Sequence, residues 1–298
     1  MVHYDKCPLC SSGNISLKLK TTDYFLSKEP FSIFHCSECG FIFTQDHPDE
    51  EKSARYYESE DYLSHGDAKN DFVSRIYRFS REIMLQKKVK LVQDLSGIST
   101  GTILDIGSGT GHFLNSMKKA GWDVKGIEIN RKARDFSIAS FALDVKEPAQ
   151  LEYLKPETFD CITLWHVLEH FHDPFGYAQH IHRLLKPCGI CIIALPNCSS
   201  FDAEYFGSFW AAYDVPRHIW HFSTKTFRRF CEQTGFKVTE IRSLPLDVFY
   251  ISFLSEKYKG ANLPFLSGMI KGSWFRLLTL FNKQRTSSMT YVLTPCPS

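Results

Sequence analysis

The stretch ILDIGSGTGHFL, residues 103–114, places a short apolar strand, a glycine-rich turn and the start of a helix in direct succession. Gly107, Gly109 and Gly111 let the backbone of the turn come close to a ligand. The free N–H groups at the start of the following helix face the same point. This order of elements predicts a ligand site at a strand-to-helix junction of an α/β sheet.

The residues around these glycines restrict the ligand. In the dinucleotide-binding fingerprint G-x-G-x-x-G the last glycine packs helix on strand, but here it comes one residue early and His112 takes its place. Asp105 would repel a pyrophosphate, whereas it suits a ligand with an ammonium group. Glu128 lies 21 residues after Gly107, where an acid accepts hydrogen bonds from ribose hydroxyls. A ligand with an amino group, a ribose and no phosphate is indicated, and S-adenosylmethionine meets this description.

Strand and helix patterns alternate from residue 101 onward, which predicts a doubly wound, Rossmann-like parallel sheet. The segment 189–196 is nearly all apolar, as expected of a central strand that is buried on both faces. Asp144 and Val145 end the third expected strand and are the predicted adenine contacts. Strands are expected at 102–106, 122–129, 141–145, 159–165, 189–196, 236–244 and 289–293, and helices at 112–120, 131–140, 174–186 and 224–235.

Four cysteines near the N-terminus form two C-x-x-C knuckles, Cys7 with Cys10 and Cys36 with Cys39. Two such knuckles complete a tetrahedral four-thiolate shell for Zn²⁺, and a closed shell of this kind is structural. The segments between the knuckles indicate short strands. A zinc ribbon is therefore predicted. The alternatives are four unrelated cysteines or a redox role for one C-x-x-C pair.

Composition sets the broad class. The 298 residues include 35 basic and 33 acidic side chains, so no global field points to nucleic acid or to an anionic membrane. No apolar run has the length of a membrane helix, and no secretory signal is evident, so a cytoplasmic location is expected. We expect a small-molecule partner, no nucleic-acid or membrane partner, and a monomer or homodimer.

Four regions are expected along the chain. Residues 1–44 are the zinc ribbon, and residues 45–100 are a connector with a helical lid. Within this second region, 45–66 is acidic and aromatic and 67–95 has helical spacing of its apolar residues. Residues 101–243 are the S-adenosylmethionine-binding core, and residues 244–298 form a C-terminal cap that contains the last strand.

Four successive motifs, LDIGSGTG, GIEIN, FDCITLWHVLEHFHDP and RLLKPCGICIIALPN, resemble those of class I S-adenosylmethionine-dependent methyltransferases. The resemblance covers roughly residues 70–243 and is to the branch with ubiquinone-pathway O-methyltransferases and many small-molecule enzymes. A four-cysteine ribbon before such a core resembles a subgroup that includes sugar C-methyltransferases. The resemblance implies a seven-stranded sheet and a sugar, quinone-like or natural-product acceptor. The cofactor contacts that it implies are Asp105, Gly107, Ser108, Gly109, Gly111, Glu128, Ile129, His166 and Val167.

The segment LWHVLEHFHDP, residues 164–174, has the H-x-x-E-H order of some zinc peptidases in His166, Glu169 and His170. The resemblance gives a different interpretation, because it places this segment across a strand-to-helix junction with His166 against the cofactor. An Asp-Pro pair at 173–174 is a regular helix opening. A structural role, with Glu169 and His170 bound to loop backbone, remains the alternative to a metal site.

The aromatic segment WAAYDVPRHIWHFS, residues 210–223, follows the fifth strand, where the resemblance places the acceptor. A hydroxyl or carbon acid must lose a proton during methylation, and a histidine can accept it near neutral pH. His218 is the first candidate for this base and His221 the second. Packing in the core is the alternative for both histidines, and Arg217 is expected to bind a carboxylate or a nearby acid.

Further acceptor contacts are predicted from position alone. The residues expected to bind the acceptor are Tyr213, Arg217 and Tyr250, with Tyr205 and Trp210 as walls and Asp247 and Ser288 within reach. Core packing is the commoner role of such aromatic residues. Two other functions remain open: a nicotinamide-dependent oxidoreductase, and a non-catalytic binding protein whose ribbon contacts a macromolecule. The glycine loop and Glu128 favour the methyltransferase.

Overall fold

The computed structural model describes residues 1–57 and 72–296. The connector expected at 45–66 and the start of the helix expected at 67–95 lie partly outside the described residues. Within the described part of the chain, no helix combines the length and the apolar character needed to cross a membrane.

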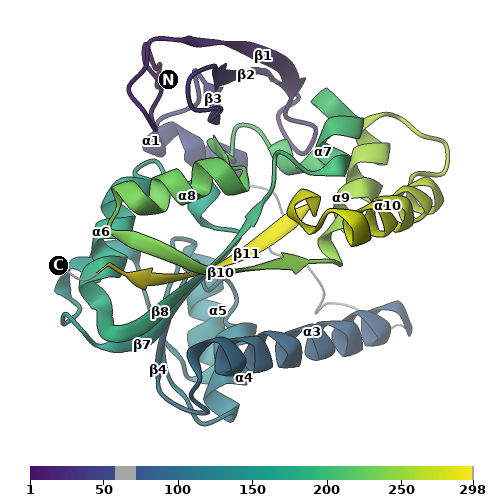
Figure 1. The fold of residues 1–298 in the computed structure, drawn as a ribbon. Coiled ribbons are helices and arrows are strands. Elements are labelled where there is room, and N and C mark those ends of the chain that lie inside the picture. Colours follow the sequence, from purple (N-terminus) through teal and green to yellow (C-terminus); the bar gives the residue numbers. More distant parts are fainter. Residues whose placement is uncertain (58–71, 297–298) are drawn as a thin grey trace.

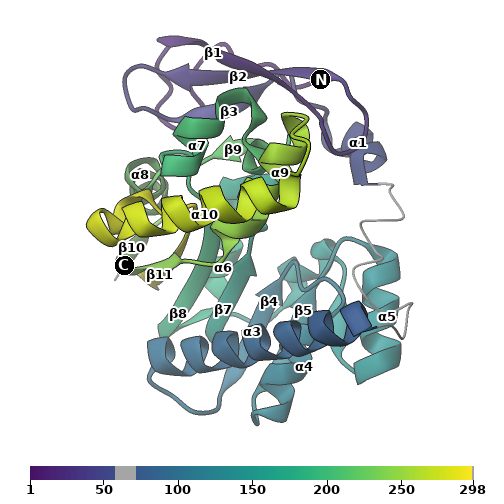
Figure 2. The same ribbon diagram turned by 90° about the vertical axis from the view of Figure 1, so that its right-hand side faces the viewer.

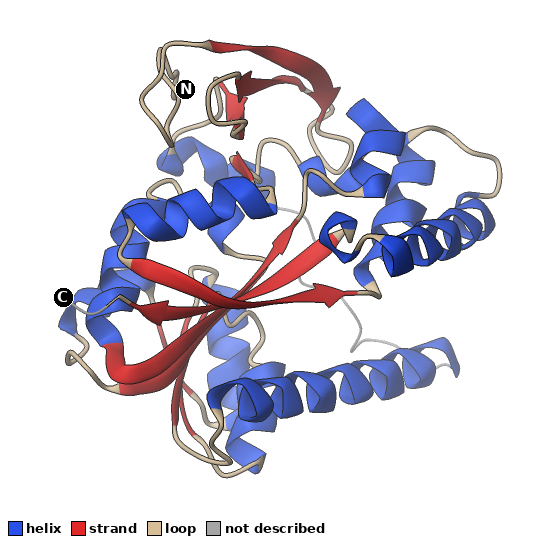
Figure 3. Ribbon diagram, in the orientation of Figure 1, coloured by secondary structure: helices blue, strands red, loops and turns tan. Residues whose placement is uncertain are grey.

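A seven-stranded sheet forms the centre of the molecule (Figures 1 and 3). Five neighbouring strands run parallel, and the two at one edge, β11 and β10, are antiparallel to their neighbours. The strands β5 and β6 lie on one side of β4, whereas the next strands in the chain, β7 and β8, lie on its other side. Ligands bind at such a switch point, here between β4 and β7, in open α/β sheets. The strands in spatial order are β10 (Phe236–Leu244), β11 (Ser288–Pro295), β8 (Leu185–Pro196), β7 (Phe159–Trp165), β4 (Thr102–Ile106), β5 (Asp123–Ile127) and β6 (Asp144–Lys146).

Helices cover both faces of this sheet, as Figure 1 shows. The helices α3 (Phe72–Ser96) and α4 (His112–Lys119) pack on one face around Ile103 and Ile192. The helices α6 (Pro174–Leu184) and α8 (Thr224–Gln233) cover the other face around Leu104 and Ile162, and α5 (Arg131–Phe141) follows β5. Adjacent strand residues face opposite sides, so each central strand is apolar on both faces.

The N-terminal ribbon forms a second sheet in the order β1 (Ile15–Thr22), β2 (Pro30–Cys36), β3 (Ile42–Gln45) and β9 (Trp220–His221). The fourth strand comes from the segment after β8, so core and ribbon share one sheet. Phe41 stacks on Trp220, with ring centroids 6.0 Å apart, and the buried residues of the ribbon join the core cluster of the central sheet. The ribbon is thus fixed to the core by backbone pairing and by aromatic packing.

The C-terminal region forms a helical hairpin beside the edge of the large sheet. It consists of α9 (Asp247–Tyr258) and α10 (Pro264–Phe281), and α7 (Phe201–Phe206) contacts both helices. Figure 2 shows α10 lying across the face turned to the viewer. The remaining short elements are α1 (Glu50–Ser53), η1 (Ala54–Tyr57), η2 (Pro148–Tyr153), η3 (Leu168–His170), η4 (Gly207–Phe209), η5 (Ala211–Tyr213) and η6 (Lys283–Arg285).

The structure confirms the expected α/β fold and its seven-stranded sheet. The Asp173 side chain accepts a hydrogen bond from the N–H of Gly176, and Pro174 is the first residue of α6, as the sequence predicted. The third strand was placed wrongly. Residues 141–145 were expected, but β6 covers Asp144–Lys146 because α5 continues to Phe141 and ends with Ala142 in the left-handed conformation.

Candidate active site

The glycine loop after β4 has the backbone that only glycine adopts readily. Gly107, Gly109 and Gly111 all have positive φ angles, of 76°, 54° and 77°. A Cβ atom on Gly107 would lie 2.4 Å from the side chain of Val167, whereas a Cβ on Gly109 would meet nothing within 4 Å. The backbone of Gly109 therefore faces open space, and Val167 covers the start of the loop.

Glu128 follows β5 and lies directly against this loop. Its Oε2 accepts a hydrogen bond of 2.7 Å from the N–H of Gly109, and its Oε1 accepts one of 2.7 Å from the N–H of Asn130. The residue is buried, whereas the neighbouring Ile129 is 69% exposed. Each carboxylate oxygen has a second lone pair. The arrangement offers hydrogen-bond acceptors and an apolar side chain at one point beside the glycines.

Asp105 is buried behind the loop. Its Oδ1 accepts a 2.6 Å hydrogen bond from the hydroxyl of Thr163 on the neighbouring strand. Burial raises the pKa of this carboxyl to about 7, although the hydrogen bond and the positive charge of Lys88 act in the opposite direction. The Lys88 ammonium lies 4.2 Å from the ring centre of Trp165. Sequence analysis did not identify Lys88 or Trp165, because no motif marks a lysine on a preceding helix.

The predicted adenine contacts lie at the next strand. Val145 is buried in β6, and Asp144 is exposed with its Oδ2 3.8 Å from the Lys125 ammonium. Ser108 is buried and its N–H donates to the carbonyl of Ile127. Ser108 therefore belongs to the glycine loop, and the Asp144 carboxylate lies near Lys125.

His166 directly follows β7 with a positive φ of 58° and stands between two carboxylates. Its Nε2 is 3.2 Å from Asp247 Oδ2, and its Nδ1 is 3.5 Å from Glu169 Oε1. Burial alone would lower the pKa of His166, but the two carboxylates outweigh burial and raise it to about 9. His166 is therefore a cation at neutral pH and holds the start of α9 against the end of β7.

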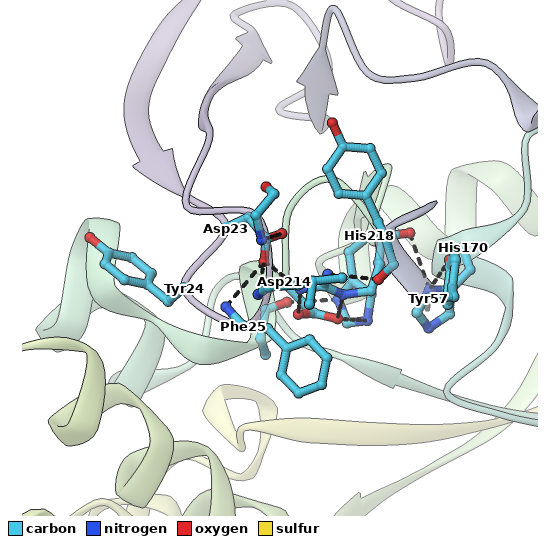
Figure 4. Close-up of polar contacts among 12 residues, drawn as sticks. Asp23, Tyr24, Phe25, Tyr57, His170, Asp214 and His218 are labelled. Atoms are coloured by element: carbon cyan, nitrogen blue, oxygen red, sulfur yellow. Dashed lines mark hydrogen bonds and ion pairs between the residues drawn. The ribbon is translucent and has the colours of Figure 1, made fainter. Parts of the chain in front are cut away.

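Glu169, His170 and His218 form a cluster in which Glu169 and His218 are buried and His170 is half-buried. Figure 4 shows His170 and His218 with their polar contacts. The ring centres of His170 and His218 are 4.5 Å apart. The Nδ1 atoms of His170 and His218 are 3.1 Å and 2.8 Å from the carbonyl oxygens of Arg217 and Ala212. Because a carbonyl only accepts, both Nδ1 atoms carry the proton. The Nε2 of His218 lies 3.9 Å from Asp214 Oδ2.

The environment of His170 favours its neutral imidazole. Burial and the neighbouring His218 lower the pKa of His170 to about 4. The phenol of Tyr57 lies 3.2 Å from His170 Nδ1. The ligand atoms of Glu169, His170 and His218 lie within 4.8 Å of one another, a spacing that a metal ion also requires. The peptidase pair, His166 and His170, is not part of one such group, since His166 turns to Asp247.

Arg217 is buried and its donors are taken by the protein itself; its partners Asp23 and Asp214 are labelled in Figure 4. The guanidinium donates to Asp23 Oδ1 at 2.8 Å, to both carboxylate oxygens of Asp214 at 2.6 and 3.0 Å, and to the carbonyl of Tyr56 at 3.2 Å. Its carbon Cζ lies 4.9 Å from the ring centre of Phe25. Arg217 therefore links the ribbon, the short helix η1 and the loop that carries His218.

His221 and the predicted acceptor contacts occupy different environments. His221 is buried in β9 with its Nε2 3.0 Å from the Thr44 hydroxyl, and burial lowers its pKa to about 3. Tyr213 is buried and packs edge-on against His221, whereas Tyr250 on α9 is 57% exposed. The Trp210 indole donates to a buried carboxylate of Asp202, so it is a core residue. The remaining acceptor candidates are Tyr205, exposed on α7, and Asp247 and Ser288, at the starts of α9 and β11.

A cavity of about 790 Å³ opens between the ribbon and the core. Its lining includes Lys18, Cys39, Tyr213, Lys225 and Arg285, and no residue of the glycine loop. This cavity is therefore separate from the site built around Glu128.

The four ribbon cysteines come together at one point. The Sγ atoms of Cys7 and Cys39 are 3.6 Å apart, and so are those of Cys10 and Cys36. All four sulfurs lie within 4.8 Å of one another. A disulfide requires about 2.05 Å, whereas tetrahedral zinc with bonds of about 2.3 Å separates its sulfur ligands by about 3.8 Å. The cluster has the dimensions of a zinc shell.

Known proteins resemble part of this chain. The ubiquinone biosynthesis O-methyltransferase of Ralstonia nicotianae is 33% identical over 105 residues, which cover 33% of this chain and 44% of that protein. The enzyme of the same name from Pseudomonas paraeruginosa is 30% identical over 117 residues, covering 37% of this chain and 50% of that protein. The chain thus spans about half the length of the curated relatives it matches.

A solved structure and a family model extend the comparison. The cyclopropane synthase MmaA2 from Mycobacterium tuberculosis has a TM-score of 0.51 and 17% identity, covering 84% of this chain and 100% of that chain. At that identity the likeness concerns the fold alone. A family model described as "Methyltransferase domain" matches residues 77–241, more than half of the sequence. The glycine loop, Glu128 and the loop bearing His218 all lie within this match, and the chain belongs to the methyltransferase domain family.

Proposed function

We propose that this protein is an S-adenosylmethionine-dependent methyltransferase that acts on a small-molecule acceptor. The observation that carries the proposal is the contact between Glu128 and the backbone of Gly109, because it places a carboxylate and an open glycine turn at one point. A ribose can share the carboxylate, and the exposed Ile129 offers an apolar surface to an adenine ring. Asp105, buried behind the loop, is the acid that favours a ligand with positive charge.

S-adenosylmethionine supplies an electrophilic methyl group on a sulfonium. The acceptor atom attacks the methyl carbon in line, the carbon–sulfur bond breaks, and the electron pair of that bond stays on sulfur. The chain's own residues must then align the acceptor, exclude water and remove one proton. His218 is suited to this last task because its Nε2 does not carry the proton that Nδ1 donates, and the carboxylates of Glu169 and Asp214 lie beside it to stabilise the imidazolium that forms.

The two candidate bases differ in their surroundings. His221 belongs to a strand, its Nε2 contacts Thr44, and its pKa is lowered by burial, so it is a poor acceptor of protons. His166 is already a cation between Asp247 and Glu169. Of these three histidines, His218 therefore has the geometry for a base, with His170 beside it.

The acceptor classes that we propose are sugars, quinone-like molecules and natural products, as the resemblance implies.

The first experiment is a calorimetric titration of the zinc-loaded protein with S-adenosylhomocysteine, with NAD in a parallel cell. We expect micromolar binding of S-adenosylhomocysteine and none of NAD. Glu128→Ala should weaken this binding at least tenfold, because the ribose loses a charged hydrogen-bond acceptor worth about 1.5–3 kcal/mol. Asp123→Ala is the matched control, since Asp123 is an exposed acid at the opposite end of β5.

The outcomes separate the competing functions. Binding of NAD in place of S-adenosylhomocysteine would favour an oxidoreductase, and binding of neither by folded protein would favour the binding-module hypothesis. Equal affinities of the Glu128→Ala and wild-type proteins would remove Glu128 from the ribose contact.

A second experiment tests the base. His218→Ala should lower turnover on the true acceptor by at least a hundredfold, which is the usual contribution of general base catalysis, about 10²–10⁴. The affinity for S-adenosylhomocysteine should change by less than threefold, because Glu128 and the glycine loop are untouched. His221→Ala is the comparison, with loss of stability as its main effect. Normal turnover of folded His218→Ala would exclude His218 as the base.

A further inference from the structure

The helix α10 is apolar on two opposite sides. One side packs against α9 through Gly268 and Gly272, where an added Cβ would lie 2.5 Å from Phe253 Cα and 2.8 Å from the Phe249 ring. The other side carries Leu266, Ile270, Trp274, Leu277 and Phe281, spaced as neighbours along one helical stripe.

This outer stripe is exposed. Ile270 is 62%, Trp274 56% and Phe281 86% exposed, and Leu266 and Leu277 are close to half exposed. The loop that leads into the helix adds Leu263, which is 66% exposed. A contiguous apolar surface of this size marks an interaction site, whereas single exposed apolar residues are ordinary. Figure 2 shows this helix on the outer face of the molecule.

Basic side chains outnumber acidic ones around the stripe, although Lys271 and Arg285 are paired with Glu256 and Glu204. Residues 257–298 contain six basic side chains and no acidic one, although the whole chain is nearly balanced with 35 basic and 33 acidic residues. Lys271 and Arg276 lie on α10 to either side of the apolar stripe, and Lys283 is exposed just beyond its end. Lys271 pairs with Glu256 of α9 at 2.5 Å, and Lys257 and Lys259 are exposed at the end of α9.

We propose that the outer face of α10 docks this protein on an anionic lipid surface, with the helix parallel to the surface. A helix with tryptophan, phenylalanine and leucine on one side and flanking lysine and arginine is built for the boundary between headgroups and acyl chains. Basic residues near this boundary are attracted to anionic headgroups. The excess of basic over acidic side chains in residues 247–298 favours this partner over a second copy of the hairpin, which would bring like net charges together.

This proposal departs from the expectation of no membrane partner. That expectation considered the net charge of the whole chain and the length of apolar runs. The global balance conceals the charge separation, since the basic C-terminal segment leaves the rest of the chain with a net negative charge. The docking surface is also independent of the proposed methyl transfer, so each can fail without the other.

The test is co-sedimentation of the full chain with vesicles of phosphatidylcholine alone or mixed with phosphatidylglycerol. We expect binding to the mixed vesicles, at least tenfold weaker binding to the neutral ones, and weakening by added salt. Binding should shift the tryptophan emission of the wild type to the blue, and Trp274→Phe should remove most of that shift. Ile270→Ser combined with Phe281→Ser should weaken binding to mixed vesicles at least tenfold.

The matched control is Tyr153→Ser, because Tyr153 is 77% exposed and lies outside the hairpin. This variant should bind as the wild type does. Unchanged circular dichroism and melting temperature of the double variant would show that it folds. Absence of vesicle binding by the wild type at low salt would overturn the proposal, and so would equal binding by the double variant. A dimer that the double variant dissociates, without vesicle binding, would assign the same face to a second copy instead.

Discussion

At the scale of the residue, Asp105 shows how the proposed ligand site works against stability. The carboxyl is buried beside Thr163, and its pKa rises to about 7 because burial penalises the ionised form. Nothing in the packing of β4 requires an acid at this position. An ionisable group held in so unfavourable a place indicates a role in binding or catalysis rather than in folding.

The pH dependence of stability tests this interpretation. The folded pKa of about 7 lies above the ordinary value of 3.8, so the folded state holds the proton more tightly and stability falls as pH rises between these values. A shift of this size corresponds to on the order of 4 kcal/mol at pH 8. Asp105→Asn should therefore raise the melting temperature at pH 8, and the gain should shrink progressively as pH falls from 7 toward 4.

Asp160 serves as a control, because its pKa is shifted in the opposite direction, below the ordinary value. Burial opposes its ionisation, but Lys186 and the Thr102 backbone outweigh burial and lower its pKa. Asp160→Asn should destabilise the protein at neutral pH, with a loss that disappears on acidification. Thermal unfolding of both variants across this pH range makes the comparison. A stabilisation of Asp105→Asn that does not depend on pH would show that Asp105 titrates normally.

At the scale of the element, the sequence predicted the regular parts of the fold and missed those that depend on distant partners. The strands at 159–165 and 236–244 were predicted to the residue, because the first is a short, buried apolar run and the second begins directly after Gly235. The hairpin of α9 and α10 was missed. Since α10 is apolar on both its inner and outer sides, its sequence lacks the polar face that reveals a surface helix.

The ribbon shows the same limit. Its four cysteines were identified from spacing alone, whereas its fourth strand, β9, was not, because two residues are too few to show a period of two. The candidate site likewise has one part that the sequence predicts and another that depends on distant partners. The glycine loop and Glu128 are local in sequence, but the contact of Arg217 with Asp23 joins residues 194 apart.

Zinc content tests the ribbon as an element. Cys36→Ser should lower the zinc content and the melting temperature together, because the free energy of metal binding contributes to folding. Cys188→Ser is the control, since Cys188 is exposed and lies outside the cluster. Mass spectrometry of the metal should give one equivalent of zinc in the wild type.

The second possible ligand group, Glu169 with His170 and His218, gives this experiment a further use. His170→Ala should keep the full zinc content. If the wild type held a second equivalent of zinc and this variant lost it, the histidine cluster would be a metal site. The Nε2 of His218 would then bind the metal and could not act as the base. Full zinc retention by Cys36→Ser would contradict the four-thiolate shell.

At the scale of the whole molecule, one buried cation joins parts that the sequence separates. Arg217 binds Asp23 of the ribbon loop, the Tyr56 carbonyl of η1, and Asp214 beside the loop that carries His218. Asp23 in turn accepts hydrogen bonds from the N–H groups of Phe25, Leu26 and Ser27. The sequence indicated an acceptor contact for Arg217, but its donors already serve the protein. Its role is to hold the ribbon and the candidate base in one arrangement.

A double-mutant cycle tests this role. Arg217→Met should lower the free energy of unfolding by about 3–5 kcal/mol, because it leaves Asp23 and Asp214 buried without their cation. Asp23→Asn should also destabilise, and the double variant should lose less than the sum of the two, by on the order of 1 kcal/mol or more. Urea denaturation measures each value. Affinity for S-adenosylhomocysteine should stay within threefold of the wild type, since the Glu128 site is separate from this cluster. Additive losses of unfolding free energy would mean that Arg217 and Asp23 do not act together. A raised KM of Arg217→Met with unchanged stability would show that Arg217 binds the acceptor.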